Sequence, residues 1–128
     1  FDDAIYTALR CLQEINFRKD GLEEFIKNLP KSFSSPEIRI ECKEEEKFKI
    51  IQNIKTIALK KYQLSDLLLI DGVRAKTTIG WWLIRASNTQ AALIVCAESD
   101  TNENLKQLLN KVRNYLKLVG VKEISDKI

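Results

Sequence analysis

The sequence predicts an α+β domain, in which an antiparallel four-stranded sheet has helices packed on one face and is preceded by a short helical segment. Two observations predict this class. Hydrophobic residues recur at helical spacing before residue 30 and with a period of two after Pro36. From residue 36 onward, the expected order is strand, helix, three strands and helix. The 128 residues, 45% hydrophobic and 30% charged, suffice for one ordered domain with its own core.

The first 29 residues predict two helices. The apolar positions of the first helix lie at Ile5, Ala8, Leu9, Leu12 and Ile15. Asp2 and Asp3 precede them, where the helix dipole favours acidic side chains. The segment Lys19-Asp20-Gly21 breaks the pattern, and residues 22–29 predict a second, shorter helix. Residues 30–36 combine two prolines with three serines, which indicates a hinge or linker.

The next segment predicts a half-buried strand and then a helix. Residues 38–42 alternate between apolar and charged side chains, as expected of a strand with one buried face. The glutamates at positions 44–46 crowd the expected start of the helix, where its dipole favours acids. The apolar stripe of this helix is expected to consist of Phe48, Ile51, Ile54, Ile57 and Ala58.

Three strands and a final helix complete the predicted domain. The first strand runs through residues 67–76 with a turn at Asp71-Gly72, and the other two span residues 81–85 and 93–97. Asp100 or Thr101 is expected to cap the final helix, which ends at Gly120. The apolar stripe of this helix consists of Leu105, Leu108, Leu109, Val112, Leu116 and Val119.

Composition argues against several classes of function. The net charge is only +3, which gives weak grounds for binding nucleic acid or a membrane surface. No segment approaches the roughly 20 apolar residues of a membrane span. Three well-separated cysteines indicate reduced thiols in a cytoplasmic protein. The sequence has no histidine, the commonest general base and metal ligand, and its lack of methionine indicates a piece of a longer chain.

Polar side chains gather in one segment between two hydrophobic strands, residues 85–90. This segment brings a guanidinium group, two hydroxyls and two carboxamides into six positions. Arginine offers a planar fork of donors, the hydroxyls and amides donate further, and the backbone N–H groups of a tight loop can converge on the same oxygens. The segment therefore suits a dianionic phosphate, and not catalysis, because none of its side chains titrates near neutrality. The alternative is a solvated loop whose side chains satisfy its own backbone.

Three other features have structural explanations beside functional ones. Trp81 and Trp82 could stack on a sugar or a base, but neighbouring strand residues face opposite ways, so we expect one in the core and one at a surface or interdomain contact. Arg74 and Lys76 could extend a basic rim, although a solvated strand face is the simpler interpretation. The glutamates at 44–46 could attract a metal, but their place at a helix start favours dipole compensation.

Several segments resemble one enzyme family. Asp71-Gly-Val-Arg74 and Trp82-Leu-Ile-Arg-Ala-Ser-Asn-Thr89, followed by a strand that ends at Ala97-Glu98, are similar to the carboxy-terminal domain of the α-D-phosphohexomutases, above all their bacterial phosphomannomutase/phosphoglucomutase branch. Residues 1–6 resemble the end of the third domain of that family, and residues 34–38 resemble the entry to the fourth. The resemblance implies that residues 1–33 are a helical remnant of the third domain with its linker. Residues 36–128 would then be the carboxy-terminal phosphate-binding domain.

The resemblance also implies a reaction. Family members transfer a phosphoryl group from a phosphoserine in the first domain to a hexose phosphate, with Mg²⁺ bound by Asp residues of the second domain. The fourth domain binds the phosphate that is not being transferred and closes the active-site cleft. Matched by position, the phosphate ligands would be Arg85, Ser87, Asn88, Thr89 and Gln90. Gln90 and Ala91 stand where Glu and Pro are commoner in the family; Gln90 keeps a hydrogen-bonding end, and Ala91 makes the loop exit more flexible.

The phosphoserine loop, the metal-binding Asp cluster and the sugar-recognition loop of the family have no counterpart in these residues. We therefore expect no catalytic residue and no metal or cofactor site in this chain, and no catalysis by the chain alone. The expected partners are a mannose or glucose phosphate and domains 1–3 of the same protein, without nucleic acid or membrane. A second hypothesis is a non-catalytic module that binds nucleic acid or protein, because the order of elements also resembles the fold of the TATA-binding protein. Against it, no basic or aromatic ladder lines the strands.

Overall fold

The structure is a computed structural model that describes residues 3–18, 21–122 and 124. It divides into two compact units, residues 1–31 and residues 32–128. Asp2, Lys19 and Asp20, which the sequence analysis placed at the start and the end of the first helix, lie outside the described residues.

The first unit consists of helices α1 (Ala4–Phe17) and α2 (Gly21–Lys27), as the spacing predicted. Helix α1 begins at Asp3, whose carboxylate accepts a hydrogen bond of 2.8 Å from the backbone N–H of Tyr6. Neither helix contains a buried residue. Within this unit, the apolar stripe of α1 is therefore mostly exposed, and Ile15 is half-buried.

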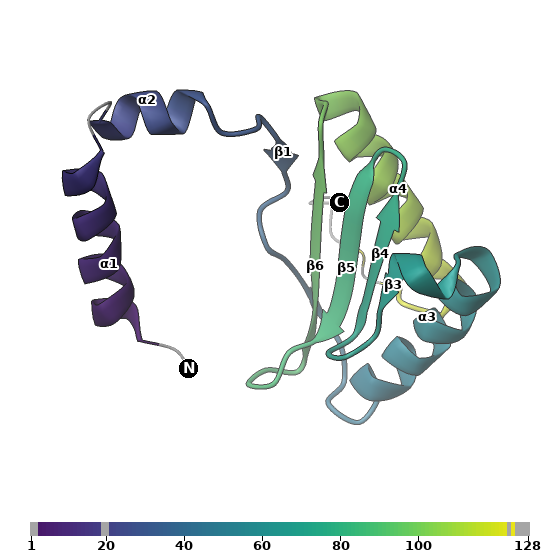
Figure 1. Cartoon of the computed structure of the whole chain (residues 1–128). Helices are drawn as coiled ribbons and strands as arrows, with labels where there is room; N and C mark the ends of the chain where they lie inside the picture. The colour runs from purple at the N-terminus through teal and green to yellow at the C-terminus, as the bar shows by residue number, and fades with distance from the viewer. Residues whose placement is uncertain (1–2, 19–20, 123, 125–128) are drawn as a thin grey trace. The chain divides into compact units, whose positions relative to one another are not determined.

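The sheet of the second unit is antiparallel and has six strands in the part of the chain that the structure describes (Figure 1). The strands are β1 (Phe33–Ser34), β2 (Ile38–Glu41), β3 (Leu67–Leu68), β4 (Val73–Thr77), β5 (Gly80–Ala86) and β6 (Ala92–Ser99). Their order is β1-β6-β5-β4-β3, and β2 also pairs with β6. The predicted α+β class with an antiparallel sheet is confirmed. Strands β2, β5 and β6 are predicted ones. The single strand predicted over residues 67–76 is wrong: β3 and β4 pair antiparallel, because the turn at Asp71-Gly72 reverses the chain. The two-residue strand β1 was not predicted.

The short strand β1 lies within the segment that the sequence analysis interpreted as a linker. Phe33 pairs with Ser99 and Ser34 with Glu98, while β2 pairs further along the same strand, where Ile38 lies opposite Val95. Between them, Ser35 binds Ala97 through its backbone N–H at 2.9 Å and through its hydroxyl, which accepts from the Ala97 N–H at 3.0 Å. The serines and prolines of this segment thus interrupt an edge strand without detaching it from β6.

Helices α3 (Lys47–Lys61) and α4 (Asn102–Leu118) lie on the same side of the sheet (Figure 1). A 3₁₀ turn, Leu64–Asp66, follows α3. The sheet residues that face the helices alternate along the strands, because successive strand side chains point to opposite faces. The buried core includes Ile38, Ile40, Val73, Ala75, Trp82, Ile84, Leu93, Val95 and Ala97 of the sheet and Ile50, Ile51, Ile54, Ala58, Leu105, Leu108, Val112 and Leu116 of the helices.

The aromatic centre of this core explains the two tryptophans. Trp82 is fully buried, and its ring lies 6.0 Å from that of Tyr62 and 5.4 Å from that of Tyr115. Its indole N–H donates to the Tyr62 hydroxyl at 3.3 Å. Trp81 faces the other way and stays partly exposed, with the Arg74 guanidinium 4.5 Å from its ring. The expectation of one core and one surface tryptophan is confirmed, and Tyr115 is a core residue that the apolar stripe of α4 did not include.

The helix starts differ from expectation in one respect. Thr101 caps α4, since its hydroxyl accepts from the N–H of Asn104 at 3.1 Å. In α3, the buried stripe begins at Lys47 instead of Phe48, whose side chain is 60% exposed. Phe48 was predicted to be buried because it is apolar. Lys47 is buried instead, because the carbonyls of Ser87 and Gln90 and the carboxylate of Glu44 compensate its charge.

None of the helices in the described ranges combines the length and hydrophobicity needed to span a bilayer.

Tyr115 links the stability of the second unit to alkaline pH. Its side chain is buried, and its hydroxyl lies 3.2 Å from that of Tyr62. Burial and this hydrogen bond raise the pKa of Tyr115 well above its ordinary value. The folded protein therefore holds this proton more tightly than the unfolded chain does. The stability that this group contributes is complete below a pH of about 10 and is lost as the pH rises from there toward the raised pKa.

We expect the free energy of unfolding to fall above pH 10 by up to about 1.4 kcal/mol per pH unit because of this group. Urea unfolding from about pH 8 to about pH 11 on the unsubstituted chain and on Tyr115→Phe measures this contribution, since Phe has no proton to lose. The stability difference between the two proteins should change with pH over this range. Parallel pH profiles would show that Tyr115 does not titrate differently in the folded and unfolded states.

Candidate functional site

The loop between β5 and β6 begins later than the polar segment of residues 85–90 that the sequence indicated. Arg85 and Ala86 belong to β5, where they pair with Ile94 and Leu93 of β6. The ladder ends with a hydrogen bond of 2.9 Å from the N–H of Ser87 to the carbonyl of Ala92. Residues 87–91, called here the β5–β6 loop, therefore connect the strands, and Arg85 projects from a strand immediately before this loop. Figure 1 shows the loop at one end of the sheet.

The structure brings the predicted phosphate ligands to this end of the sheet but gives them different surroundings. Arg85 is partly exposed on the face opposite the helices, and its guanidinium lies 3.9 Å from the carboxylate of Asp71. Ser87 is 5% exposed, and its hydroxyl accepts a bond of 3.4 Å from the Thr89 N–H. Asn88 and Thr89 are exposed.

Gln90, the fifth predicted ligand, has its carboxamide engaged from β2. Its side-chain oxygen accepts a hydrogen bond from Arg39, whose guanidinium also pairs with Glu37 at 2.6 Å. Because the oxygen end of the amide faces Arg39, the NH₂ end is the one that can donate elsewhere. Arg39 was not among the predicted site residues.

Arg39 lies on the same sheet face as Arg85. Both residues are paired with Ile94, from β2 on one side and from β5 on the other, and directly paired residues share a face. Two guanidinium groups thus flank one isoleucine on the face opposite the helices. The signal in the sequence was the alternation of residues 38–42, but only the register of β2 on β6 aligns Arg39 with Arg85.

Lys47 is the second residue near the loop that the sequence analysis missed. Its side chain is 2% exposed, although it is a lysine at the start of a helix. Its ammonium group donates to the carbonyl oxygens of Ser87 at 2.8 Å and Gln90 at 3.4 Å, and it lies 2.5 Å from the carboxylate of Glu44. The spacing of Lys47 to Ile50, Ile51, Ile54 and Ala58 follows the buried face of α3 and could have indicated its position.

Two of the three glutamates before α3 form ion pairs. Glu44 pairs with Lys47, and Glu46 lies 3.7 Å from the ammonium group of Lys43. Glu46 precedes α3 but makes no capping hydrogen bond through its side chain. Within residues 3–18, 21–122 and 124, no group of three or more His, Cys, Asp or Glu side chains is placed to hold a metal ion.

Two thiols lie close to the site but are poorly suited to covalent chemistry. The backbone N–H of Cys42 donates to the Ala91 carbonyl at 3.0 Å, and Cys96 lies on β6. Burial raises the pKa of both thiols; nearby glutamates raise it further, while Lys47 acts against this at Cys42 and Arg85 acts against it at Cys96. Both thiols therefore stay protonated at neutral pH, where a thiol is a weak nucleophile. The arrangement suits binding an anion better than bond-breaking chemistry.

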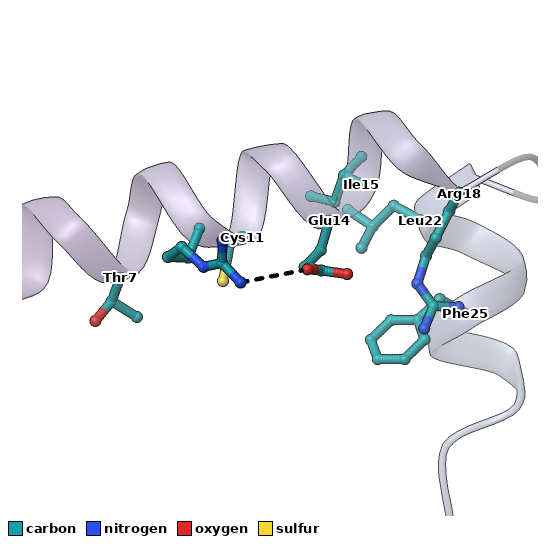
Figure 2. Close-up of a pocket in the computed structure, with 8 residues that line it drawn as sticks. Thr7, Cys11, Glu14, Ile15, Arg18, Leu22 and Phe25 are labelled. Carbon is teal, nitrogen blue, oxygen red and sulfur yellow. Dashed lines mark ion pairs between the residues drawn. The ribbon is translucent and has the colours of Figure 1, made fainter.

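A separate hollow lies within the first unit. Figure 2 shows residues that line it, among them Thr7, Cys11, Glu14 and Ile15 on α1 and Leu22 and Phe25 on α2. The Arg18 guanidinium lies 4.2 Å from the centre of the Phe25 ring. The hollow contains none of the predicted phosphate ligands.

The fold and the site define a small α+β domain with a polar loop between its two central strands. This chain belongs to the family described as phosphoglucomutase/phosphomannomutase, C-terminal domain, which matches residues 37–114. The family resemblance seen in the sequence is thereby confirmed.

Named relatives agree with this assignment. A phosphomannomutase/phosphoglucomutase of Pseudomonas aeruginosa is 37% identical over 119 residues, which are 93% of this chain and 25% of the relative. A phosphoglucomutase of Neisseria meningitidis is 32% identical over 113 residues, 88% of this chain and 24% of the relative. The crystal structure of a phosphoglucomutase/phosphomannomutase family protein from Burkholderia thailandensis superposes with a TM-score of 0.76 at 25% identity, covering 95% of this chain and 25% of that one. The chain thus spans about a quarter of the length of the proteins it matches.

Proposed function

We propose that this chain provides the carboxy-terminal, phosphate-binding domain of a phosphohexomutase. In this proposal, residues 36–128 bind the phosphate of a hexose phosphate that is not being transferred, and residues 1–33 are the end of the preceding domain with its linker. The observation that supports this best is the exposed β5–β6 loop with Arg85 beside it on the open face of the sheet. Membership of the family supports the same role.

The ligand set follows from the donors around the loop. Arg85 would bind two phosphate oxygens through its planar fork, and the exposed side chains of Asn88 and Thr89 would donate further hydrogen bonds. Gln90 would donate through its NH₂ group, since Arg39 holds the oxygen end of this amide. The hydroxyl of the buried Ser87, which accepts from the Thr89 N–H, would donate a further hydrogen bond to the phosphate.

Binding this phosphate would contribute to the reaction by positioning. A hexose phosphate held at one end presents its other end to the phosphoserine in a fixed geometry, and closure of the domain over the cleft would exclude water that could hydrolyse the phosphoserine. The whole protein would interconvert 1-phosphates and 6-phosphates of mannose or glucose in the cytoplasm. Mg²⁺, which stabilises charge on the transferred phosphoryl group, and the phosphoserine would lie outside these 128 residues, so the chain alone would bind phosphate without turnover.

Removal of Arg85 tests the proposed role. We expect inorganic phosphate and glucose 1-phosphate to shift the backbone amide signals of residues 85–90 in an NMR titration of the chain. Arg85→Ala should lower the affinity for both ligands at least about tenfold, because a hydrogen bond to a charged group contributes about 1.5–3 kcal/mol. Arg113→Ala is the matched control, since this arginine lies on α4, across the sheet from the open face.

The control separates a bound anion from general attraction to a basic protein. Equal losses in Arg85→Ala and Arg113→Ala, or shifts spread over the whole surface, would contradict a site at the loop. The same shifts with sulfate at equal affinity would indicate an unselective anion site. Tight, salt-dependent binding of DNA by the unsubstituted chain would favour the nucleic-acid hypothesis instead.

A further inference from the structure

Lys47 occupies a position that packing alone would give to an apolar residue. It lies on the buried face of α3 in line with Ile50, Ile51 and Ile54, and its side chain is 2% exposed. A buried ammonium group destabilises a fold unless partners compensate its lost hydration. Lys47 has three such partners, which match its three N–H donors: the carbonyls of Ser87 and Gln90 and the carboxylate of Glu44.

We propose that Lys47 is a positioning residue for the β5–β6 loop: its buried ammonium group fixes the loop in the conformation that presents its donors to a phosphate. The proposal rests on the proposed phosphate-binding role of the loop. Lys47 itself is not a ligand in this scheme, because its donors are already directed at Ser87, Gln90 and Glu44.

The two carbonyls lie near the two ends of the loop, three positions apart in the sequence. Ser87 follows β5, and the Gln90 carbonyl also accepts from the N–H of Ala92 at the start of β6, at 2.9 Å. One ammonium group therefore joins both ends of the loop to the first residue of α3. Two other contacts hold the loop from the β2 side, since Arg39 donates to the Gln90 amide oxygen and the Cys42 N–H donates to the Ala91 carbonyl. Lys47 differs from these because it is buried and binds backbone carbonyls near both ends of the loop.

Because the peptide bond is planar, the contacts of Lys47 with two carbonyls also fix the direction of the N–H groups that follow them. In a planar trans peptide, the C=O of one residue and the N–H of the next point in opposite directions. Since the carbonyl of Ser87 points at the buried Lys47, the N–H of Asn88 points away from it. The same relation directs the N–H of Ala91 away from the carbonyl of Gln90. Lys47 thus orients backbone donors as well as the side chains between them.

The charge of Lys47 also favours binding of an anion at the loop. Its ammonium group lies directly beneath the loop at 2.8 Å from a loop carbonyl, where screening by solvent is weak. Glu44 offsets part of this charge, but its side chain is 61% exposed, so its own field is screened more strongly. A positive potential should remain at the loop, where it favours an anion.

The experiment compares three variants of the whole chain. Lys47→Met keeps the length of the side chain and removes its donors and charge. Lys49→Met removes an exposed lysine of the same helix and controls for net charge. Ile54→Val removes one buried methylene and controls for loss of stability without any change beside the loop. For each protein we would measure the urea midpoint, the amide signals of residues 85–92 without ligand, and the dissociation constant for inorganic phosphate.

We expect Lys47→Met to shift the amide signals of the loop in the absence of ligand and to speed the exchange of these amides with solvent. We also expect it to lower the affinity for inorganic phosphate at least about tenfold. Lys49→Met should change phosphate affinity less than about twofold, as expected for an exposed charge. Ile54→Val should lower the urea midpoint and leave both the loop amides and phosphate affinity as they were. If Lys47→Met and Ile54→Val alter phosphate affinity equally at equal stability, Lys47 has only a structural role and the inference is wrong.

The outcomes also separate this inference from the proposed function. If the unsubstituted chain binds no phosphate but Lys47→Met still disorders the loop, the phosphate role fails while the positioning role stands. If phosphate binds and Lys47→Met leaves the loop amides and the affinity unchanged, the positioning role fails alone. Should Lys47→Met not fold, the side-chain ammonium signal of Lys47 in the unsubstituted chain decides: slow exchange and a shift on adding phosphate support the inference, and rapid exchange with no shift contradicts it.

Discussion

Trp82→Ala should lower the free energy of unfolding by about 3–5 kcal/mol, because truncation of a buried aromatic side chain leaves a cavity that the surroundings fill only in part. Trp82 is fully buried, is in contact with the rings of Tyr62 and Tyr115, and donates its indole N–H to Tyr62. Its loss would remove a contact between the sheet and both covering helices. Urea unfolding followed by circular dichroism would measure the change.

Trp81→Ala is the control for Trp82→Ala, because the neighbouring tryptophan faces the other way and stays partly exposed. Its removal should cost much less, since part of its surface is already hydrated. Similar losses in the two variants would contradict the packing of Trp82 against Tyr62 and Tyr115 in the core. If Trp82→Ala is too unstable to purify, Trp82→Phe should give a smaller loss of the same sign.

Gly72→Ala should destabilise the second unit and weaken the site at the same time. Gly72 has a φ of +116°, and a Cβ atom there would lie 2.4 Å from the Ile84 carbonyl oxygen and 2.7 Å from the Cβ of Arg85. The backbone conformation alone costs about 1–3 kcal/mol for a residue with a side chain. The clash adds to this and would displace Arg85, so phosphate affinity should fall together with the urea midpoint.

Gly120→Ala separates the two causes. Gly120 also has a positive φ, of +86°, but a Cβ atom there would meet nothing within 4 Å. This variant should lose stability through backbone strain alone and keep the phosphate affinity of the unsubstituted chain. If Gly72→Ala and Gly120→Ala behave alike in both measurements, the close approach of Gly72 to β5 is not important for the site.

Much of the fold could be predicted because the pattern of apolar residues depends on the period of each element. The alternation around residues 38–42 and the stripe of α4 both gave elements that the structure confirms. The short strand β1 within residues 30–36 was not predicted, because prolines and serines usually mark a break. This segment is kept on the sheet by the pairing of β1 with β6 and by the contact of Ser35 with Ala97. That contact joins residues 62 positions apart, which no local pattern records.

The site was predictable in part for the same reason. Its loop stood out because polar residues interrupt two apolar strands, and this signal is local. Arg39 and Lys47 did not stand out, since their places depend on the register between β2 and β6 and on the contact of α3 with the loop. The burial of Lys47 was also difficult to predict because a lysine is seldom buried, so Phe48 was the better candidate for the interior.

The hydrogen bonds of Lys47 have a consequence for how this domain can change during evolution. Lys47 recognises the main-chain carbonyls of residues 87 and 90 and no side chain of the loop. Substitutions at Asn88 or Thr89 therefore leave that anchor intact, because every residue type supplies the same carbonyl group. The side chains of the loop can therefore change, and with them its ligand preference, while Lys47 maintains the backbone conformation of the loop.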